Sequence, residues 1–138
     1  MKTKIITLLL CISLSATICA QDSDYTLIEK TVSYYLDGGT NNDFETLKKA
    51  FHKTATMKFI RNGKYVEVNA IEFFKKAITP GPKQNRKTYV SYINISGNVA
   101  NAKLQIDYET FSFIDYMNLI KIDGEWKVVS KIFYRKKN

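Results

Sequence analysis

Apolar side chains recur every three or four residues in three segments of the chain, which is the spacing of a helix with one buried face. These segments cover residues 24–39, 43–53 and 70–78. Gly38-Gly39 is a stop signal at the end of the first segment, and Pro80-Gly81-Pro82 follows the third. The pattern therefore predicts three helices, all of them before Pro80.

Three other segments alternate between apolar and polar residues, as strands with one buried face do. They cover residues 56–69, 88–108 and 111–134. Each segment contains a two-residue turn signal: Asn62-Gly63, Gly97-Asn98 and Asp123-Gly124. The pattern predicts three β-hairpins.

A two-residue turn determines which residues of a hairpin lie opposite each other. In the first two hairpins the predicted pairs are Phe59–Val66, Lys58–Glu67, Ile95–Ala100, Ile93–Ala102 and Ser91–Leu104. In the last hairpin they are Leu119–Val128, Met117–Ser130, Asp115–Ile132 and Phe113–Tyr134. This register predicts that the acid Asp115 shares one side of the hairpin with Trp126 and Tyr134.

The order of these elements indicates an α+β domain, in which three helices cover one face of a strongly curved, mainly antiparallel sheet of about six strands. No repeat or long linker divides residues 21–138, so we expect a single domain.

The first 20 residues have the order of a secretory signal peptide, with Lys2 and Lys4, an apolar run and then small and polar residues. We expect cleavage near Ala20 and export to the periplasm or out of the cell. A lipoprotein anchor is disfavoured because Ile18, not a small residue, precedes Cys19. The apolar run is too short to span a membrane.

Charge and chemistry exclude several classes of function. The net charge is +8, and after residue 20 the basic residues are mostly scattered along the chain, with one dense run at Arg135-Lys136-Lys137, which disfavours nucleic-acid binding. Both cysteines, Cys11 and Cys19, lie in the expected leader, and His52 is the single histidine. The sequence therefore predicts neither a metal site nor a cofactor.

Two motifs suggest a family. The stretch FIDYMNLIKIDGEWKVVSKIFY at residues 113–134 and AFHKTA at residues 50–55 resemble the Putative lumazine-binding family of the nuclear transport factor two-like (SnoaL-like) superfamily. The resemblance implies a cone-shaped fold with a cavity. Many relatives have a histidine at the position of Tyr134. The superfamily includes isomerases, cyclases, dehydratases and binding proteins, so the fold does not determine the activity.

The predicted register brings Asp115 near the hydroxyl groups of Ser130 and Tyr134. In a catalytic interpretation, Asp115 is a general base and Tyr134 donates a hydrogen bond to an oxyanion. In the alternative, Asp115 is a buried acid that these hydroxyls satisfy. His52, near the end of the second predicted helix, either contacts ligand or caps that helix. The predicted ligand contacts are Tyr35, His52, Asp115, Met117, Trp126, Ser130 and Tyr134.

The other side of the last hairpin is also apolar and indicates a homodimer formed through the sheet. The predicted interface consists of Ile114, Tyr116, Ile120, Val129 and Phe133. Sheet curvature or the C-terminal tail is the alternative cover for these residues. The sequence thus favours an exported protein that binds a small apolar or aromatic ligand without chemistry. An acid–base enzyme that uses Asp115 and an interaction module with a filled cavity are the alternatives.

Overall fold

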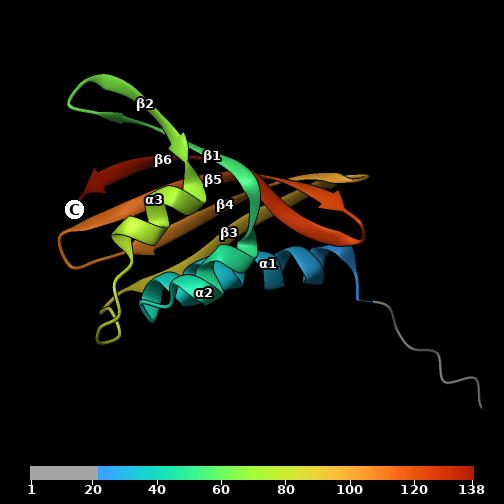
Figure 1. Cartoon of the computed structure of the whole chain (residues 1–138), viewed down its shortest axis with the longest axis horizontal. Helices are drawn as coiled ribbons and strands as arrows, with labels where there is room; N and C mark the ends of the chain where they lie inside the picture. The colour runs from blue at the N-terminus through green and yellow to red at the C-terminus, as the bar shows by residue number, and fades with distance from the viewer. Residues whose placement is uncertain (1–21) are drawn as a thin grey trace, which may run out of the picture.

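The helices lie on one side of a curved sheet in the computed structural model, which describes residues 22–138 (Figure 1). The helical segments are α1 (Asp24–Thr40), α2 (Phe44–Leu47), a 3₁₀ turn η1 (Lys48–Ala50) and α3 (Ala70–Ala77). The strands are β1 (Phe51–Arg61), β2 (Lys64–Asn69), β3 (Lys87–Ser96), β4 (Val99–Asp107), β5 (Phe111–Ile122) and β6 (Glu125–Lys137). The predicted α+β class, with three α-helices on a six-stranded sheet, is confirmed.

The strand order in the sheet is β2-β1-β6-β5-β4-β3. Strands β1 and β6 pair in parallel, and every other pair is antiparallel. The first strand, β1, therefore lies beside the last, β6. This pairing brings the N-terminal helices close to the C-terminal hairpin. No helix within residues 22–138 is long and apolar enough to cross a membrane.

Local sequence signals account for the ends of the helices. The Ser23 side chain accepts a hydrogen bond from the Thr26 amide at the start of α1, and Asn69 caps α3 in the same way. Gly38 does not end α1, which continues to Thr40. A Cβ atom on Gly38 would collide with the backbone of Leu47, so the glycine allows α2 to pack closely against α1.

The second predicted helix is too long. Its α-helical part ends at Leu47, η1 follows, and strand β1 begins at Phe51. His52 therefore lies in a strand, and the prediction that it caps a helix is wrong. Pairing of β1 with β2 and β6 overrides the helical spacing of these residues, as tertiary contacts commonly do.

The first two hairpins largely follow their turns. Phe59 pairs with Val66 and Lys58 with Glu67, as predicted. In the second hairpin, the pairs Ile95–Ala100 and Ile93–Ala102 are confirmed. The predicted pair Ser91–Leu104 is wrong, because Ser91 is an extra residue in β3 and Val90 lies opposite Leu104.

The last hairpin departs from its predicted register in the middle. Leu119 pairs with Val128 as expected, but the next pair is Asn118–Ser130, so Val129 is an extra residue in β6. Such a β-bulge reverses the side on which every later residue of the strand lies. The pairs beyond it are Met117–Lys131, Asp115–Phe133, Phe113–Arg135 and Ile114–Tyr134, in place of those predicted.

Candidate ligand-binding cavity

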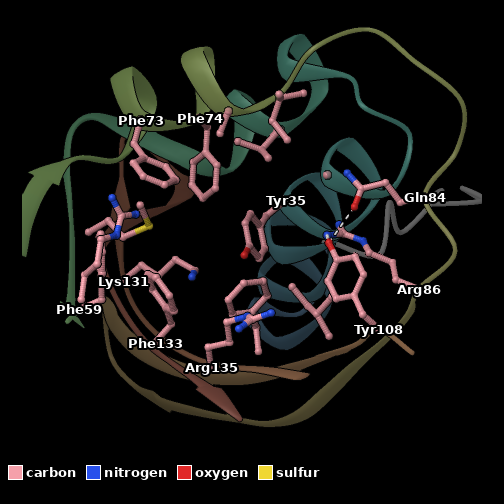
Figure 2. Close-up of a pocket in the computed structure, with 18 of the residues that line it drawn as sticks. Tyr35, Phe59, Phe73, Phe74, Gln84, Arg86, Tyr108, Lys131, Phe133 and Arg135 are labelled. Atoms are coloured by element: carbon pink, nitrogen blue, oxygen red, sulfur yellow. Dashed lines mark hydrogen bonds between the residues drawn. The ribbon is translucent and has the colours of Figure 1, made fainter. Parts of the chain in front are cut away.

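A cavity of about 610 Å³ opens between the curved sheet, α1 and α3. Its volume lies in the range typical of small-molecule sites, roughly 300–1,000 Å³. Figure 2 shows the sheet as an arc around the side chains that project into this space. The aromatic residues of its wall are Tyr35, Phe59, Phe73, Phe74, Tyr108, Phe113 and Phe133.

The parallel strands β1 and β6 build the wall in three layers. Met57 lies beside Lys131 and forms the deep layer with it; their exposed fractions are 1% and 3%. Two residues farther along each strand, Phe59 and Phe133 begin the ring layer, with their ring centroids 4.8 Å apart. Phe113 of β5 completes this layer, 5.5 Å from Phe133.

The third layer is the mouth, which consists of Arg61 at the end of β1 and Arg135 near the end of β6. Both side chains line the cavity, and both residues are exposed to solvent. Alternate residues of a strand point to the same side, so β1 and β6 each contribute one residue to every layer. The wall therefore changes from buried to aromatic to cationic along the two strands.

A buried polar cluster lies at the bottom of the cavity. The Lys131 Nζ atom is 2.8 Å from Asp115 Oδ1, and the Tyr35 hydroxyl donates a 2.7 Å hydrogen bond to Asp115 Oδ2. Asp115 is completely buried. Asp115 Oδ1 accepts no hydrogen bond from residues 22–138, so its contact with Lys131 is an ion pair by distance.

Burial shifts the proton affinities in this cluster. It lowers the pKa of Lys131 below the ordinary 10.5, although the nearby Asp115 carboxylate opposes the change. Burial, and then the charge of Asp115, raises the pKa of Tyr35 well above 10.0. Tyr35 is thus a fixed hydrogen-bond donor at neutral pH. Lys131 and Tyr35 line the cavity, and Asp115 lies behind them.

A second polar wall is organised by Arg86 (Figure 2). Its guanidinium donates hydrogen bonds to Thr40 Oγ1 at 2.9 Å, to the Tyr108 hydroxyl at 2.9 Å and to the Leu36 carbonyl at 2.8 Å. The Tyr108 hydroxyl in turn donates to Gln84 Oε1 at 2.7 Å. These bonds hold the guanidinium rigidly, and every acceptor is a neutral group.

The predicted cluster of Asp115, Ser130 and Tyr134 does not form. The bulge at Val129 places Ser130 and Tyr134 on the outer side of β6, where Tyr134 is 67% exposed. Neither residue lines the cavity, so Tyr134 cannot act on a ligand there. Phe133, predicted at a dimer interface, instead belongs to the ring layer.

The other predicted contacts have mixed outcomes. Tyr35 lines the cavity, but His52, Met117 and Trp126 do not. His52 Nδ1 lies 2.8 Å from Thr54 Oγ1 in β1. Met117 and Trp126 are buried in the core, so they leave the cavity unfilled. The Trp126 indole donates a 2.9 Å hydrogen bond to Asp24, away from this site.

Sequence reasoning missed the cationic residues of the site, which are Arg61, Arg86, Lys131 and Arg135. A signal for three of them was available. Phe133 and Arg135 repeat the ring-then-arginine order of Phe59 and Arg61 in β1. A single extra residue in β6 would have placed Lys131, Phe133 and Arg135 on the same side of the sheet as Met57, Phe59 and Arg61. Arg86 could not be found in this way, because its hydrogen-bond partners are distant in the sequence and no local sequence pattern indicates them.

Comparisons with known proteins agree with the observed fold. The sequence profile of the Putative lumazine-binding family matches residues 23–134. The chain belongs to this family. An NTF2-like protein of unknown function from Shewanella baltica OS155 is similar in structure, with a TM-score of 0.77 and 27% identity over 86% of this chain and 100% of that chain. The predicted family and superfamily are thus confirmed.

Two further relatives extend the comparison. An NTF2-like protein of unknown function from Methylobacillus flagellatus KT has a TM-score of 0.73 and 27% identity, covering 86% of this chain and 96% of that chain. The protein named Aldolase FrzH, from Cladobotryum sp., is 23% identical over 81% of this chain and 91% of its own length.

Proposed function

We propose that the protein binds a small, flat organic molecule in the cavity. The observation that supports this most directly is the ring-lined space of about 610 Å³ above Lys131 and Tyr35. Flat ligands gain affinity from offset or edge-to-face contacts with such rings. The core residues Met117 and Trp126 leave this space open, which disfavours an interaction module with a filled cavity.

Ligand-induced thermal stabilisation tests the proposal. Steroids, flavin precursors and aromatic polyketides are suitable compounds, because a ligand at 100 times its Kd stabilises the folded state by about 2.7 kcal/mol. Ala77→Trp, at the cavity end of α3, should remove the stabilisation by occupying the space. Lys76→Trp is the matched control, because Lys76 and Ala77 are both exposed but only Ala77 lines the cavity.

An acid–base enzyme is the second candidate, favoured by the buried cluster of Lys131, Asp115 and Tyr35. Lys131 and Tyr35 both contact Asp115 and line the cavity, but burial lowers the pKa of Lys131 and raises that of Tyr35 well above 10.0. Lys131 would therefore exchange the proton, and Asp115 would position it. The resemblance to a protein named as an aldolase supports chemistry at a carbonyl compound.

This second candidate requires a compound that the protein converts. Lys131→Met should then abolish turnover, and Asp115→Asn should reduce it, in protein shown to be folded by circular dichroism. An unchanged rate in Asp115→Asn would remove the positioning role of Asp115, and an unchanged rate in both variants would remove the cluster from the mechanism. Binding of the compound in either case would leave the first proposal intact.

Export and dimerisation stay predictions. The expected signal peptide lies outside residues 22–138. The outer side of the sheet still presents Ile114, Tyr116, Ile120 and Val129, and the bulge adds Ile132 and Tyr134 in place of Phe133. Two copies joined through this side would leave both cavities accessible, because the cavity is on the opposite side of the sheet.

A further inference from the structure

The cavity wall has an excess of positive charge. Its lining residues include Arg61, Arg86, Lys131 and Arg135, but no Asp or Glu from the described part of the chain. Asp115 neutralises Lys131 from behind the wall. None of the three arginines has a carboxylate oxygen within 4.0 Å among residues 22–138. Within the described part of the chain, the wall thus has three arginines without an acidic partner.

The two mouth arginines are held against aromatic rings instead of acids. The Arg61 guanidinium carbon lies 4.9 Å from the centre of the Phe59 ring, and that of Arg135 lies 3.9 Å from the centre of the Phe111 ring. Stacking holds a guanidinium in place without using its N–H donors. Neither guanidinium donates a hydrogen bond to another residue of the range 22–138, so these donors can bind an anionic group at the mouth.

The rings beneath the mouth form a continuous surface between the two arginines. Phe59 contacts Phe133, Phe133 contacts Phe113, and Phe113 contacts Phe111, with centroid distances of 4.8, 5.5 and 5.3 Å. An aromatic ligand can lie against this surface while its acidic group remains near the arginines. Arginine is well suited to carboxylate and sulfonate groups, because its N–H donors match two acceptor oxygens.

We infer that the preferred ligand is a flat aromatic acid, whose ring packs against the ring layer and whose anionic group binds Arg61 and Arg135 at the mouth. This inference rests on the proposed binding function and adds the charge of the ligand to it. The sequence analysis predicted an apolar or aromatic ligand and did not assign Arg61 or Arg135 to the site.

A matched pair of fluorescent probes tests the sign of the charge. 8-Anilinonaphthalene-1-sulfonate and N-phenyl-1-naphthylamine share the same rings, but only the first has a sulfonate. We expect the sulfonate probe to bind about tenfold more tightly, a difference of about 1.4 kcal/mol. Raising the salt concentration from about 0.05 to 0.5 M should weaken the sulfonate probe alone, because salt screens exposed charges.

Variants of the mouth locate the effect. Each of Arg61→Gln and Arg135→Gln should weaken the sulfonate probe about two- to fivefold, as expected for an exposed ion pair, and leave the neutral probe unchanged. Lys136→Gln is the matched control, because it removes the adjacent positive charge from the opposite side of β6. Ala77→Trp should exclude both probes from the cavity.

The outcomes separate the two proposals. Equal affinity for both probes, with no effect of the arginine variants, would overturn the inference and leave the binding function standing. Failure of both probes to bind the unmodified protein would contradict the proposed function, and the inference would fail with it. Equal weakening by Lys136→Gln and Arg135→Gln would mean that net charge, and not the mouth, attracts the sulfonate.

Discussion

The two halves of the last hairpin have the same alternating sequence pattern, but their inward-facing residues have different roles. Between the turn and Val128, strands β5 and β6 keep the register of a two-residue turn, and Leu119, Trp126 and Val128 fill the core. Beyond Val129 the register shifts by one residue, and Lys131 and Phe133 line a cavity. One half is packed interior, and the other is the wall of a binding site.

The difference shows that a single inserted residue can divide one strand into a part that packs in the core and a part that lines a binding cavity. Without the bulge, Ser130, Ile132 and Tyr134 would face the cavity, and Asp115 would have no cation beside it. With the bulge, Asp115 gains Lys131 as its partner, and both arginines of the mouth lie at the ends of neighbouring strands. Bulges beside binding sites commonly redirect side chains in this way.

The largest expected effect comes from removing the cation of the buried pair. Lys131→Met leaves the Asp115 carboxylate buried without a cation, and should lower the free energy of unfolding by about 3–5 kcal/mol in urea denaturation. The double variant Asp115→Asn/Lys131→Met should recover most of this loss. Lys127→Met, in the other half of β6, breaks an exposed pair with Glu125 and should cost less than about 1 kcal/mol.

An equal loss of unfolding free energy in Lys131→Met and Lys127→Met would contradict the proposed difference between the buried and the exposed ion pair of β6. So would a double variant that is less stable than Lys131→Met, because the cost is assigned to an unpaired buried charge.

Tyr35→Phe is expected to have the next largest effect. It removes a buried hydrogen bond to a charged group and should cost about 1.5–3 kcal/mol at neutral pH. The folded state keeps the Tyr35 proton above pH 10.0, where the unfolded chain releases it, because the pKa of Tyr35 is raised. The stability from Tyr35 is therefore full below pH 10.0 and falls above it.

Denaturation of both proteins across this pH range gives the measurement. The difference in unfolding free energy between the unmodified protein and Tyr35→Phe should narrow as the pH rises above 10.0. The other tyrosines are common to both proteins and cancel in the difference. A constant difference would mean that Tyr35 ionises alike in the folded and unfolded states.

The adjacent residues Ile132 and Phe133, beyond the bulge, should affect dimerisation and ligand binding respectively. Ile132→Lys, on the outer side of β6, should dissociate the predicted dimer in sedimentation experiments and leave ligand binding unchanged. Phe133→Lys should weaken ligand binding and leave the oligomeric state unchanged. A monomeric unmodified protein would exclude the dimer, and a reversal of the two effects would contradict the register.

The smallest expected effect is a spectral change near the turn. Hydrogen bonds from Lys121 and Trp126 hold the pKa of Asp24 below the ordinary 3.8, so these contacts persist above that pH and weaken as the pH falls through the lowered value. The emission of Trp126, the single tryptophan of the chain, should shift in that acidic range. Asp24→Asn should remove the shift, and a shift unaffected by this variant would assign it to acid unfolding.

The fold class could be predicted from the sequence because the turns and the apolar periodicity are local signals. Asn62-Gly63 fixed the first hairpin, and Asp123-Gly124 fixed the last hairpin as far as Val128. The site was harder to predict from the sequence. A β-bulge has no strong local sequence signature, and its position depends on how the neighbouring strands pair. Asp115 was correctly recognised as an unusual acid, but its partner Lys131 was assigned to the wrong side.

Cysteine accessibility along β6 tests the register most directly. In the full chain with Cys11→Ser and Cys19→Ser, either Phe133→Cys or Tyr134→Cys would be introduced, and reaction with a maleimide followed with and without 8-anilinonaphthalene-1-sulfonate. The bulge predicts that Tyr134→Cys reacts rapidly in both conditions, whereas Phe133→Cys reacts slowly and is protected further by the probe. Rapid, unprotected reaction of Phe133→Cys together with protection of Tyr134→Cys would contradict the account.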